Sequence, residues 1–201
     1  MNLFSQNEII NHLPYDGEVY YYGNIIRPEV ADNYYEKLMH RIAWKYDEAV
    51  MFGKHIVTKR KVAWYGDEDY SYTYSNATKQ ALAWTEELLE LKQLVEKHCD
   101  TNYNSCLLNL YHDGEEGMAW HSDDEKALAK DSSIASLSLG AARKFAFKHK
   151  ESRQTISLIL AHGSLLEMKG TTQTYWWHRL PKTKKVKRAR INLTFRRMEV
   201  A

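Results

Sequence analysis

From about residue 103 onward, polar and apolar side chains alternate within short runs that are separated by turn residues. This period is typical of β-strands, in which successive side chains point to opposite faces. The pattern predicts strands at residues 105–111, 133–139, 144–149, 155–160, 164–168, 174–178 and 190–196. Because no helical pattern separates these segments, they indicate an all-β sandwich or jelly roll.

The first hundred residues carry a mixed pattern. Arg27-Pro28-Glu29 opens a helix, because proline suits the first helical position and apolar residues then recur at helical spacing. Residues 78–97 give the clearest helix, with leucines along one face. Between these helices, residues 49–64 are strand-like with a break at Gly53, and tyrosines alternate with Ser and Thr in residues 70–75.

The two patterns meet near residue 102. We therefore predict an α+β protein in which residues 1–101 precede a β-rich core at residues 102–199. With only 3 Pro and 9 Gly, the chain shows no evident flexible linker, so the two parts should form one packed unit.

Composition adds the cellular setting. Cys99 and Cys106 lack CxxC spacing, which predicts free buried thiols in a reducing interior. No apolar run reaches the length of a membrane span, and residues 1–10 show no secretory signal. We expect a soluble, intracellular monomer without membrane contact, cytoplasmic in a bacterium or nuclear in a eukaryote. The net charge of +2 says little about partners, so local clusters must carry that argument.

His121-Ser122-Asp123 and the distant His178 form a candidate metal-ligand set. Side chains two positions apart on a strand project to the same side, which would place His121 and Asp123 on one ion. Two histidines and a carboxylate are the facial triad of non-haem Fe(II) oxygenases. A chain with nine histidines can produce this short pattern by chance, and zinc is the rival ion.

Residues 190–196 alternate between a polar and an apolar face. Arg190, Asn192, Thr194 and Arg196 share one face, and guanidinium groups match carboxylates in a bidentate geometry. Such a stripe by itself is commonly a solvated face. After the candidate ligand set, it favours a pocket for 2-oxoglutarate beside iron.

Six motifs between residues 109 and 196 resemble, in the same order, those of the AlkB family of Fe(II)/2-oxoglutarate DNA-repair dioxygenases. They are NLYHDG (109–114), HSDDE (121–125), IASLSLG (134–140), AHGSLL (161–166), HRLP (178–181) and RINLTFR (190–196). The front half is similar to the finger-bearing members of the family, typified by the human type-2 and type-3 homologues. The resemblance implies a double-stranded β-helix core with N-terminal helices and a β-hairpin nucleotide-recognition lid.

The same resemblance implies roles for individual residues. Fe(II) would be bound by His121, Asp123 and His178, which would also be the catalytic residues. 2-Oxoglutarate, which is a cosubstrate together with O2, would be held by Asn109, Tyr111, Arg190, Asn192, Thr194 and Arg196, with Arg190 on its distal carboxylate.

Substrate contacts are also implied. Phe52 beside Gly53 resembles the tip of a hairpin finger that fills the gap left by a flipped base. Lys54, Lys59, Arg60 and Lys61 would meet the DNA backbone, and a second basic cluster spans residues 182–188. Tyr72, Tyr74, Asp124 and Glu125 would face the base. Without the resemblance, Phe52 would be interpreted as a core residue and the charged clusters as solvated surface.

We therefore predict oxidative demethylation of bases such as N1-methyladenine and N3-methylcytosine in single-stranded or duplex DNA. The products would be formaldehyde, succinate and CO2. Alternatives are the same chemistry on RNA or protein, a catalytically inactive nucleic-acid-binding module, and zinc-dependent hydrolysis.

Overall fold

The computed structural model describes residues 9–51, 54–67, 71–74, 77–125 and 127–199. Within these ranges, the side chains of residues 49–51, 54, 56, 71–74 and 77–80 lie outside the description. No helix in the described ranges combines the length and the apolar composition needed to cross a bilayer.

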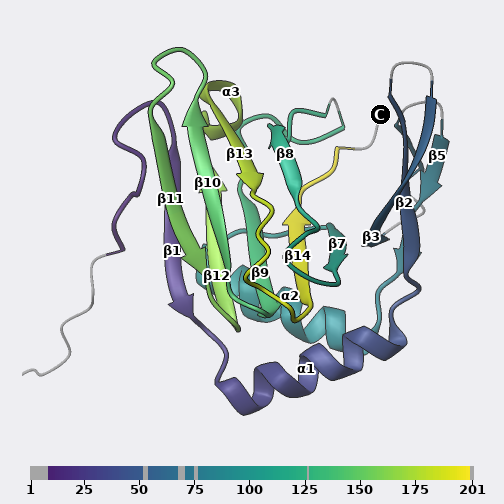
Figure 1. The fold of residues 1–201 in the computed structure, drawn as a ribbon. Helices are drawn as coiled ribbons and strands as arrows, with labels where there is room; N and C mark the ends of the chain where they lie inside the picture. The colour runs from purple at the N-terminus through teal and green to yellow at the C-terminus, as the bar shows by residue number, and fades with distance from the viewer. Residues whose placement is uncertain (1–8, 52–53, 68–70, 75–76, 126, 200–201) are drawn as a thin grey trace, which may run out of the picture.

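Two facing antiparallel sheets form the body of the molecule (Figure 1). The large sheet has the order β1 (Glu18–Asn24), β12 (Ser164–Lys169), β9 (Ile134–Gly140), β14 (Arg190–Arg196), β7 (Ser105–Tyr111), β3 (Lys54–Gly66) and β2 (Lys45–Met51), with β6 (Leu82–Ala83) pairing β3. The small sheet has the order β11 (Thr155–Leu160), β10 (Arg143–His149), β13 (Trp176–Leu180) and β8 (Met118–His121). A separate hairpin joins β4 (Ser71–Tyr74) to β5 (Ala77–Gln80). The predicted jelly-roll fold is confirmed.

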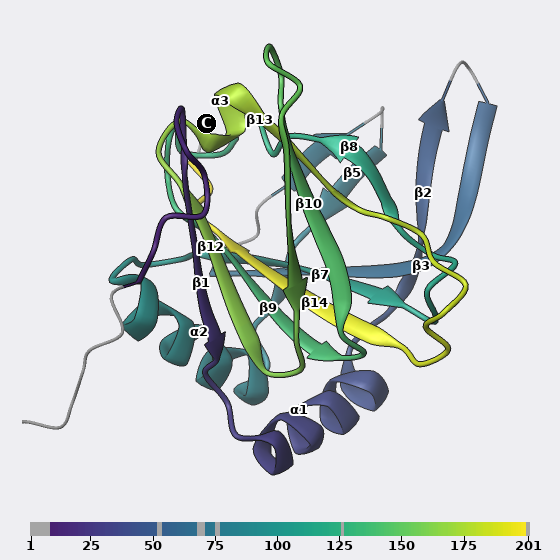
Figure 2. The ribbon, with the colours of Figure 1, turned by 60° about the vertical axis from the view of Figure 1, so that its left-hand side comes forward.

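The hydrophobic core has two parts, one on each face of the large sheet. Between the sheets lie the buried side chains of Phe147, Leu166 and Trp176. The outer face packs against α1 (Pro28–Arg41) and α2 (Glu86–Cys99) through Leu38, Leu91 and other aliphatic residues. Figure 2 shows both helices below this sheet. Each face of β14 thus has its own environment, apolar toward the helices and polar toward the small sheet.

The second helix begins later than its pattern predicted. Residues 77–80 and 82–83 form strands β5 and β6, and α2 starts only after Thr85. The Thr85 hydroxyl accepts a hydrogen bond from the Leu88 N–H, which satisfies one of the unpaired donors at the helix start. The capping residue therefore defines this boundary, and the apolar spacing upstream does not.

Three further segments depart from the predicted pattern. Residues 172–175 form a short helix, α3 (Thr172–Tyr175), before β13 begins at Trp176. Strands β1 and β8 were not predicted, because β1 is a run of tyrosines without alternation and β8 has only four residues. The remaining predicted strands of the core lie within one residue of those observed.

Strands from the front half of the chain belong to the same sheet as the core. β1 pairs with β12, and β3 pairs with β7 from Lys61–Leu110 to Gly66–Ser105. The hairpin of β2 and β3 then continues away from the body at the edge of the large sheet (Figure 2). The proposed division at residue 102 thus falls within one continuous sheet, and different roles for its two parts stay a prediction.

Candidate metal centre and cosubstrate site

A cavity of about 930 Å³ opens between the edge of the small sheet and the β2–β3 hairpin. Its walls include Val62, Trp64, Leu107, Met118 and Met198, which make them largely apolar. The polar groups in the same cavity include His121, Asp123, Glu125, Asn109 and Arg196. A few convergent polar groups within an apolar pocket are typical of a small-molecule or catalytic site.

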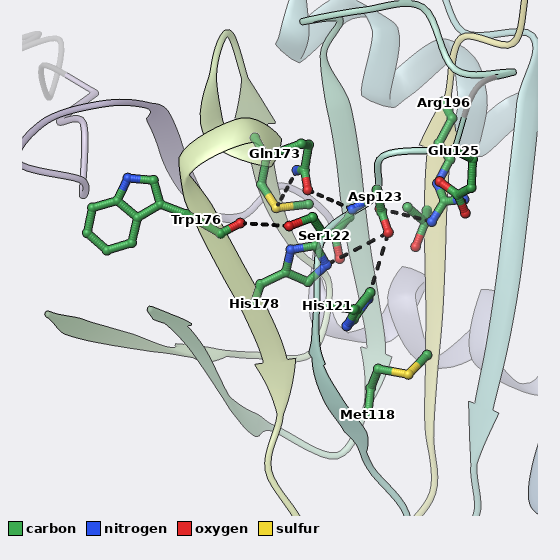
Figure 3. Close-up of polar contacts among 12 residues, drawn as sticks. Met118, His121, Ser122, Asp123, Glu125, Gln173, Trp176, His178 and Arg196 are labelled. Carbon is green, nitrogen blue, oxygen red and sulfur yellow. Dashed lines mark hydrogen bonds and ion pairs between the residues drawn. The ribbon is translucent and has the colours of Figure 1, made fainter. Parts of the chain in front are cut away.

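The structure brings the three predicted metal ligands together (Figure 3). His121 ends β8, Asp123 follows it, and His178 lies directly across from His121 on β13. Asp123 Oδ1 is 3.7 Å from His121 Nε2 and 3.9 Å from His178 Nε2. Two atoms each about 2.1 Å from a shared ion lie about 3.0 Å apart at a right angle, so a small inward rotation would bring these atoms to the ion.

Neighbouring groups orient these ligands. His121 Nδ1 lies 2.9 Å from the Ala119 carbonyl and donates to it, which leaves Nε2 free to bind an ion. Asp123 Oδ2 accepts from Arg196 Nη2 at 2.9 Å, which leaves Oδ1 for the same ion. The Asp123 backbone N–H donates to Gln173 Oε1 at 2.9 Å. The donor atoms are therefore prepared for a metal before one binds.

Burial and charge lower the pKa values of His178 and Asp123. Burial lowers the pKa of the His178 imidazole to about 3. Burial alone would raise the pKa of Asp123, but Arg196 and the two imidazoles outweigh it and hold that pKa below its usual value. A metal requires neutral imidazole and ionised carboxylate, so the electrostatics suit the ligand role.

Among the predicted cosubstrate residues of β14, Arg196 lines the cavity, whereas Arg190, Asn192 and Thr194 are buried and are not part of its lining. Arg190 is 2% exposed and donates from Nη2 to Ser138 Oγ at 2.8 Å and to Asn192 Oδ1 at 2.7 Å. Asn192 Nδ2 donates to Thr194 Oγ1 at 2.8 Å. These bonds form one polar row along β14 and its neighbour β9.

Arg190 carries a buried charge without a described acidic partner. Burial lowers its pKa to about 10, so the guanidinium remains charged at neutral pH. No ion pair joins Arg190 to an acid in the described part of the chain, and its Nε has no hydrogen-bond partner. The nearby Tyr111 ring lies 5.7 Å from its guanidinium carbon. An uncompensated buried cation is costly, so this site suits an anionic ligand.

A model of the 2OG-Fe(II) oxygenase superfamily matches residues 18–196. The chain belongs to this superfamily. The matched range includes all three candidate metal ligands and the polar row of β14. The prediction of an Fe(II)/2-oxoglutarate oxygenase is thereby confirmed at the level of the family, and the donor set described above fits both groups.

Within this superfamily, the similar curated proteins are AlkB homologues, as the motifs predicted. The DNA oxidative demethylases ALKBH2 of Bos taurus and Homo sapiens are each 43% identical to the chain over 123 residues. That segment is 57% of this chain and 44% or 47% of those relatives. The alpha-ketoglutarate-dependent dioxygenase alkB homolog 3 of Bos taurus is 41% identical over 122 residues, 56% of this chain and 43% of the relative. The match thus spans about half the length of these proteins.

A solved structure supports the fold of this oxygenase independently. The structure of OsALKBH1 superposes with a TM-score of 0.57 and covers 84% of this chain and 91% of its own. At 14% sequence identity, this likeness concerns the fold alone.

The remaining predicted site residues occupy different positions in the oxygenase. Glu125 lines the cavity, where burial raises its pKa and Arg196, 3.5 Å away, opposes the shift. Asp124 and Lys59 also line the cavity. Arg60 is mostly buried in the cavity wall, paired with Asp47 and 3.3 Å from Met118 Sδ. Lys61 Nζ lies 5.3 Å from the ring of Tyr46 on the hairpin.

Four predicted substrate contacts cannot be placed. Phe52 lies outside the described residues. Lys54, Tyr72 and Tyr74 have a described backbone in β3 and β4, but their side chains lie outside the description. The roles of these four residues stay predictions.

Sequence reasoning missed several residues that support the site. Gln173 binds the backbone of Asp123, and the Phe145 ring stacks on His178 with centroids 5.5 Å apart. Ser138 binds Arg190, and Arg143 binds the backbone of two loops at the cavity rim. The sequence gives no signal for these contacts, because each one joins segments that are distant along the chain. Leu107 also lines the cavity, and the strand period could have identified it because it lies two residues from Asn109 on β7.

Proposed function

We propose that the protein is an Fe(II)- and 2-oxoglutarate-dependent oxidative demethylase that repairs N-alkylated bases in DNA. N1-Methyladenine and N3-methylcytosine are the expected bases, and formaldehyde, succinate and CO2 the expected products. The observation that carries this proposal is the His121, Asp123 and His178 set, together with the buried Arg190, which has no described acidic partner.

The mechanism assigns a distinct task to each group. His121, Asp123 and His178 would hold Fe(II), which supplies the redox chemistry by which O2 and 2-oxoglutarate oxidise an N-methyl group. Arg190 would bind the far carboxylate of 2-oxoglutarate, since it is the buried cation of the site. Arg196 holds Asp123 Oδ2 and so fixes the carboxylate that faces the ion.

The cavity supplies the substrate pocket. Its volume of about 930 Å³ lies within the usual range for ligand pockets, roughly 300–1,000 Å³. Glu125 lies on its wall and would accept a hydrogen bond from the exocyclic amine of a flipped base. The apolar walls, including Trp64 and Leu107, would exclude water around the reacting methyl group.

Two features support a DNA substrate. The relatives named DNA oxidative demethylases share 43% identity with the chain over 123 residues. The β2–β3 hairpin projects beside the cavity, and Phe52 and Gly53 stand between its two strands in the sequence. We propose that Phe52 enters a duplex and occupies the space of the flipped base.

The test measures formaldehyde and succinate released from oligonucleotides with one N1-methyladenine, with Fe(II) and 2-oxoglutarate present. Matched single-stranded DNA, duplex DNA and RNA identify the substrate. We expect His121→Ala and Asp123→Ala to lower both products at least about a hundredfold, because an incomplete triad loses its ion. His40→Ala, an exposed histidine of α1, is the control and should retain full activity.

The outcomes separate the alternatives. Full turnover by either triad variant would contradict the ligand assignment, whereas turnover on RNA alone would replace the DNA substrate. Absence of both products and of uncoupled 2-oxoglutarate turnover in the natural sequence would indicate a binding module. Phe52→Ala should reduce duplex repair more than single-strand repair; equal losses on both would remove the finger from the proposal.

A further inference from the structure

Two loops form part of the rim of the cavity. Residues 112–117 connect β7 to β8, and residues 181–189 connect β13 to β14. Glu115, Glu116 and Gly117 from the first loop and Lys182 from the second line the cavity. We call these two loops together the lip.

Backbone hydrogen bonds join the two loops of the lip. The Gly114 N–H donates to the Val186 carbonyl at 2.9 Å, and the Thr183 N–H donates to the Gly114 carbonyl at 2.7 Å. Figure 2 shows the connection after β13 alongside the end of β7. The two loops are therefore one unit, although about 70 residues of sequence separate them.

Glycine is required for this close approach. A Cβ atom at Gly114 would lie 2.2 Å from the Thr183 carbonyl oxygen. At Gly117, it would lie 2.5 Å from the Leu180 carbonyl oxygen. Both contacts are with backbone atoms, which cannot rotate aside as a flexible side chain could.

Arg143, the first residue of β10, lies beneath the lip and binds both of its loops. Its Nη1 donates to the Asp113 carbonyl at 3.0 Å, and its Nη2 lies 2.9 Å from the Glu116 carbonyl and 3.0 Å from the Pro181 carbonyl. A longer contact, 3.3 Å, joins Nη2 to the Gly114 carbonyl. The side chain is almost completely buried, with a relative exposure of 2%.

The Arg143 guanidinium is bound by backbone carbonyls. In the described part of the chain it forms no ion pair with an acidic side chain, and backbone carbonyls take its hydrogen bonds instead. A guanidinium presents donors in a planar fork and can reach several carbonyls at once. A lysine ammonium, a single point of charge, cannot span both loops in the same way.

We infer that Arg143 is a positioning residue that fixes the lip, so that the exposed cations of the second loop meet a polynucleotide in a defined arrangement. Those cations are Lys182, Lys184, Lys185, Lys187 and Arg188. The inference rests on the proposed function for the identity of the ligand. The arrangement of the lip itself rests on the contacts of Arg143 and Gly114 alone.

The first test measures amide hydrogen exchange in the full chain, which requires no turnover. Arg143→Lys and Arg143→Met should speed exchange in peptides covering residues 112–118 and 181–188 by about tenfold or more, because local opening becomes easier. Peptides of β9 and β14 should remain unchanged. Lys144→Met, an exposed neighbour on the opposite face of β10, is the control. Unchanged exchange in the lip of both Arg143 variants would overturn the inference.

The second test separates positioning from general damage. In Arg143→Lys, the KM for a methylated oligonucleotide should rise about tenfold, while kcat and the Kd for 2-oxoglutarate change less than about twofold. Gly114→Ala keeps Arg143 but displaces the Thr183 carbonyl, and it should give the same KM effect. A joint loss of kcat and 2-oxoglutarate binding would show that Arg143 acts through the core of the protein, and would also overturn the inference.

These outcomes can be distinguished from failure of the proposed function. If the natural sequence releases no formaldehyde, the proposed function fails, and binding of an unmodified oligonucleotide measured by fluorescence anisotropy replaces the KM. A weaker Kd in Arg143→Lys with faster lip exchange would then still support the positioning role. An unaltered Kd would contradict it. Where Arg143→Met does not fold, Arg143→Lys and Gly114→Ala carry both tests.

Discussion

At the residue scale, the candidate site depends on the hydrogen bond made by the ring nitrogen or carboxylate oxygen that does not face the ion. His121 uses Nδ1 on the Ala119 carbonyl, and Asp123 uses Oδ2 on Arg196, so each leaves one atom for the ion. Arg190 differs because its positive charge is not balanced by its hydrogen-bond partners, Ser138 and Asn192, which are neutral. Two oriented metal-binding atoms, and a buried cation with no acidic partner among the described residues, favour a metal together with an anion.

The role of Arg190 can be tested by binding alone. Arg190→Met removes the charge and keeps most of the volume, and it should weaken 2-oxoglutarate binding about ten- to a hundredfold, the size expected for charge-assisted hydrogen bonds. Isothermal titration calorimetry with Mn(II) in place of Fe(II) measures this Kd without turnover. Arg188→Met, an exposed residue on the lip, is the control. An unaltered Kd in Arg190→Met would remove Arg190 from the cosubstrate site.

At the element scale, strand period and helix capping determine which side chains reach the site. β14 directs Ile191, Leu193 and Phe195 to the helices, and Arg190 with its polar neighbours to the interior. A shift of one residue in the register of β14 would exchange these faces, so the register with β7 and β9 is essential to the site. Helix α2 covers this strand from outside and carries a buried glutamate, Glu87, in its first turn.

Glu87 gives a pH-dependent contribution to stability. Hydrogen bonding to its own backbone N–H lowers its pKa, burial opposes this, and Arg41, 2.5 Å away, lowers it further. Because the folded pKa lies below the usual value of 4.5, the contribution is present above about pH 4.5 and is lost as the pH falls through the folded pKa. Arg41 is largely exposed, so the contribution should be about 1 kcal/mol or less.

The measurement compares Glu87→Gln with the natural sequence by urea denaturation. At pH 7 the variant should be less stable, and the difference should shrink as the pH falls from about 4.5 toward 3. Glu90→Gln, on the same helix and more exposed, is a matched control, although its Oε2 accepts from Tyr34. A stability difference that does not vary with pH would show that Glu87 acts through packing and not through its charge.

At the scale of the whole molecule, the net charge of +2 hides an uneven distribution. Exposed cations gather on the lip, next to a cavity that contains Asp123, Asp124 and Glu125. This arrangement places positive groups where a phosphate backbone would pass and keeps acidic groups where an ion and a base would lie. Under the proposed function, the lip would contact the backbone of the ligand and the cavity would hold its base.

Salt dependence measures this arrangement directly. Lys184→Gln together with Lys185→Gln should reduce the slope of log K against log[salt] for duplex binding by up to about 2, since each phosphate contact contributes about 0.9. Arg27→Gln together with Lys97→Gln removes the same charge near helices α1 and α2 and should leave the slope unchanged. Equal slopes in the two double variants would show that the lip makes no phosphate contact.

Local physics explains what the sequence determined about this protein. Strand period identified most of the core strands, and the His-x-Asp spacing with the alternation of residues 190–196 identified chemistry, because these patterns depend only on neighbours along the chain. The start of α2 was misplaced because a single cap outweighed the apolar spacing upstream.

Tertiary structure decided everything that depends on distant segments meeting. Closure of the two sheets places His178 across from His121 and brings Arg143 beneath two loops about 70 residues apart. It also buries Arg190 with no acidic partner among the residues that the structure describes. The energy of a buried charge or an unpaired donor depends on which groups surround it in space. That environment is a property of the packed sheets, and it creates the candidate metal-ligand set, the buried cation Arg190 and the lip.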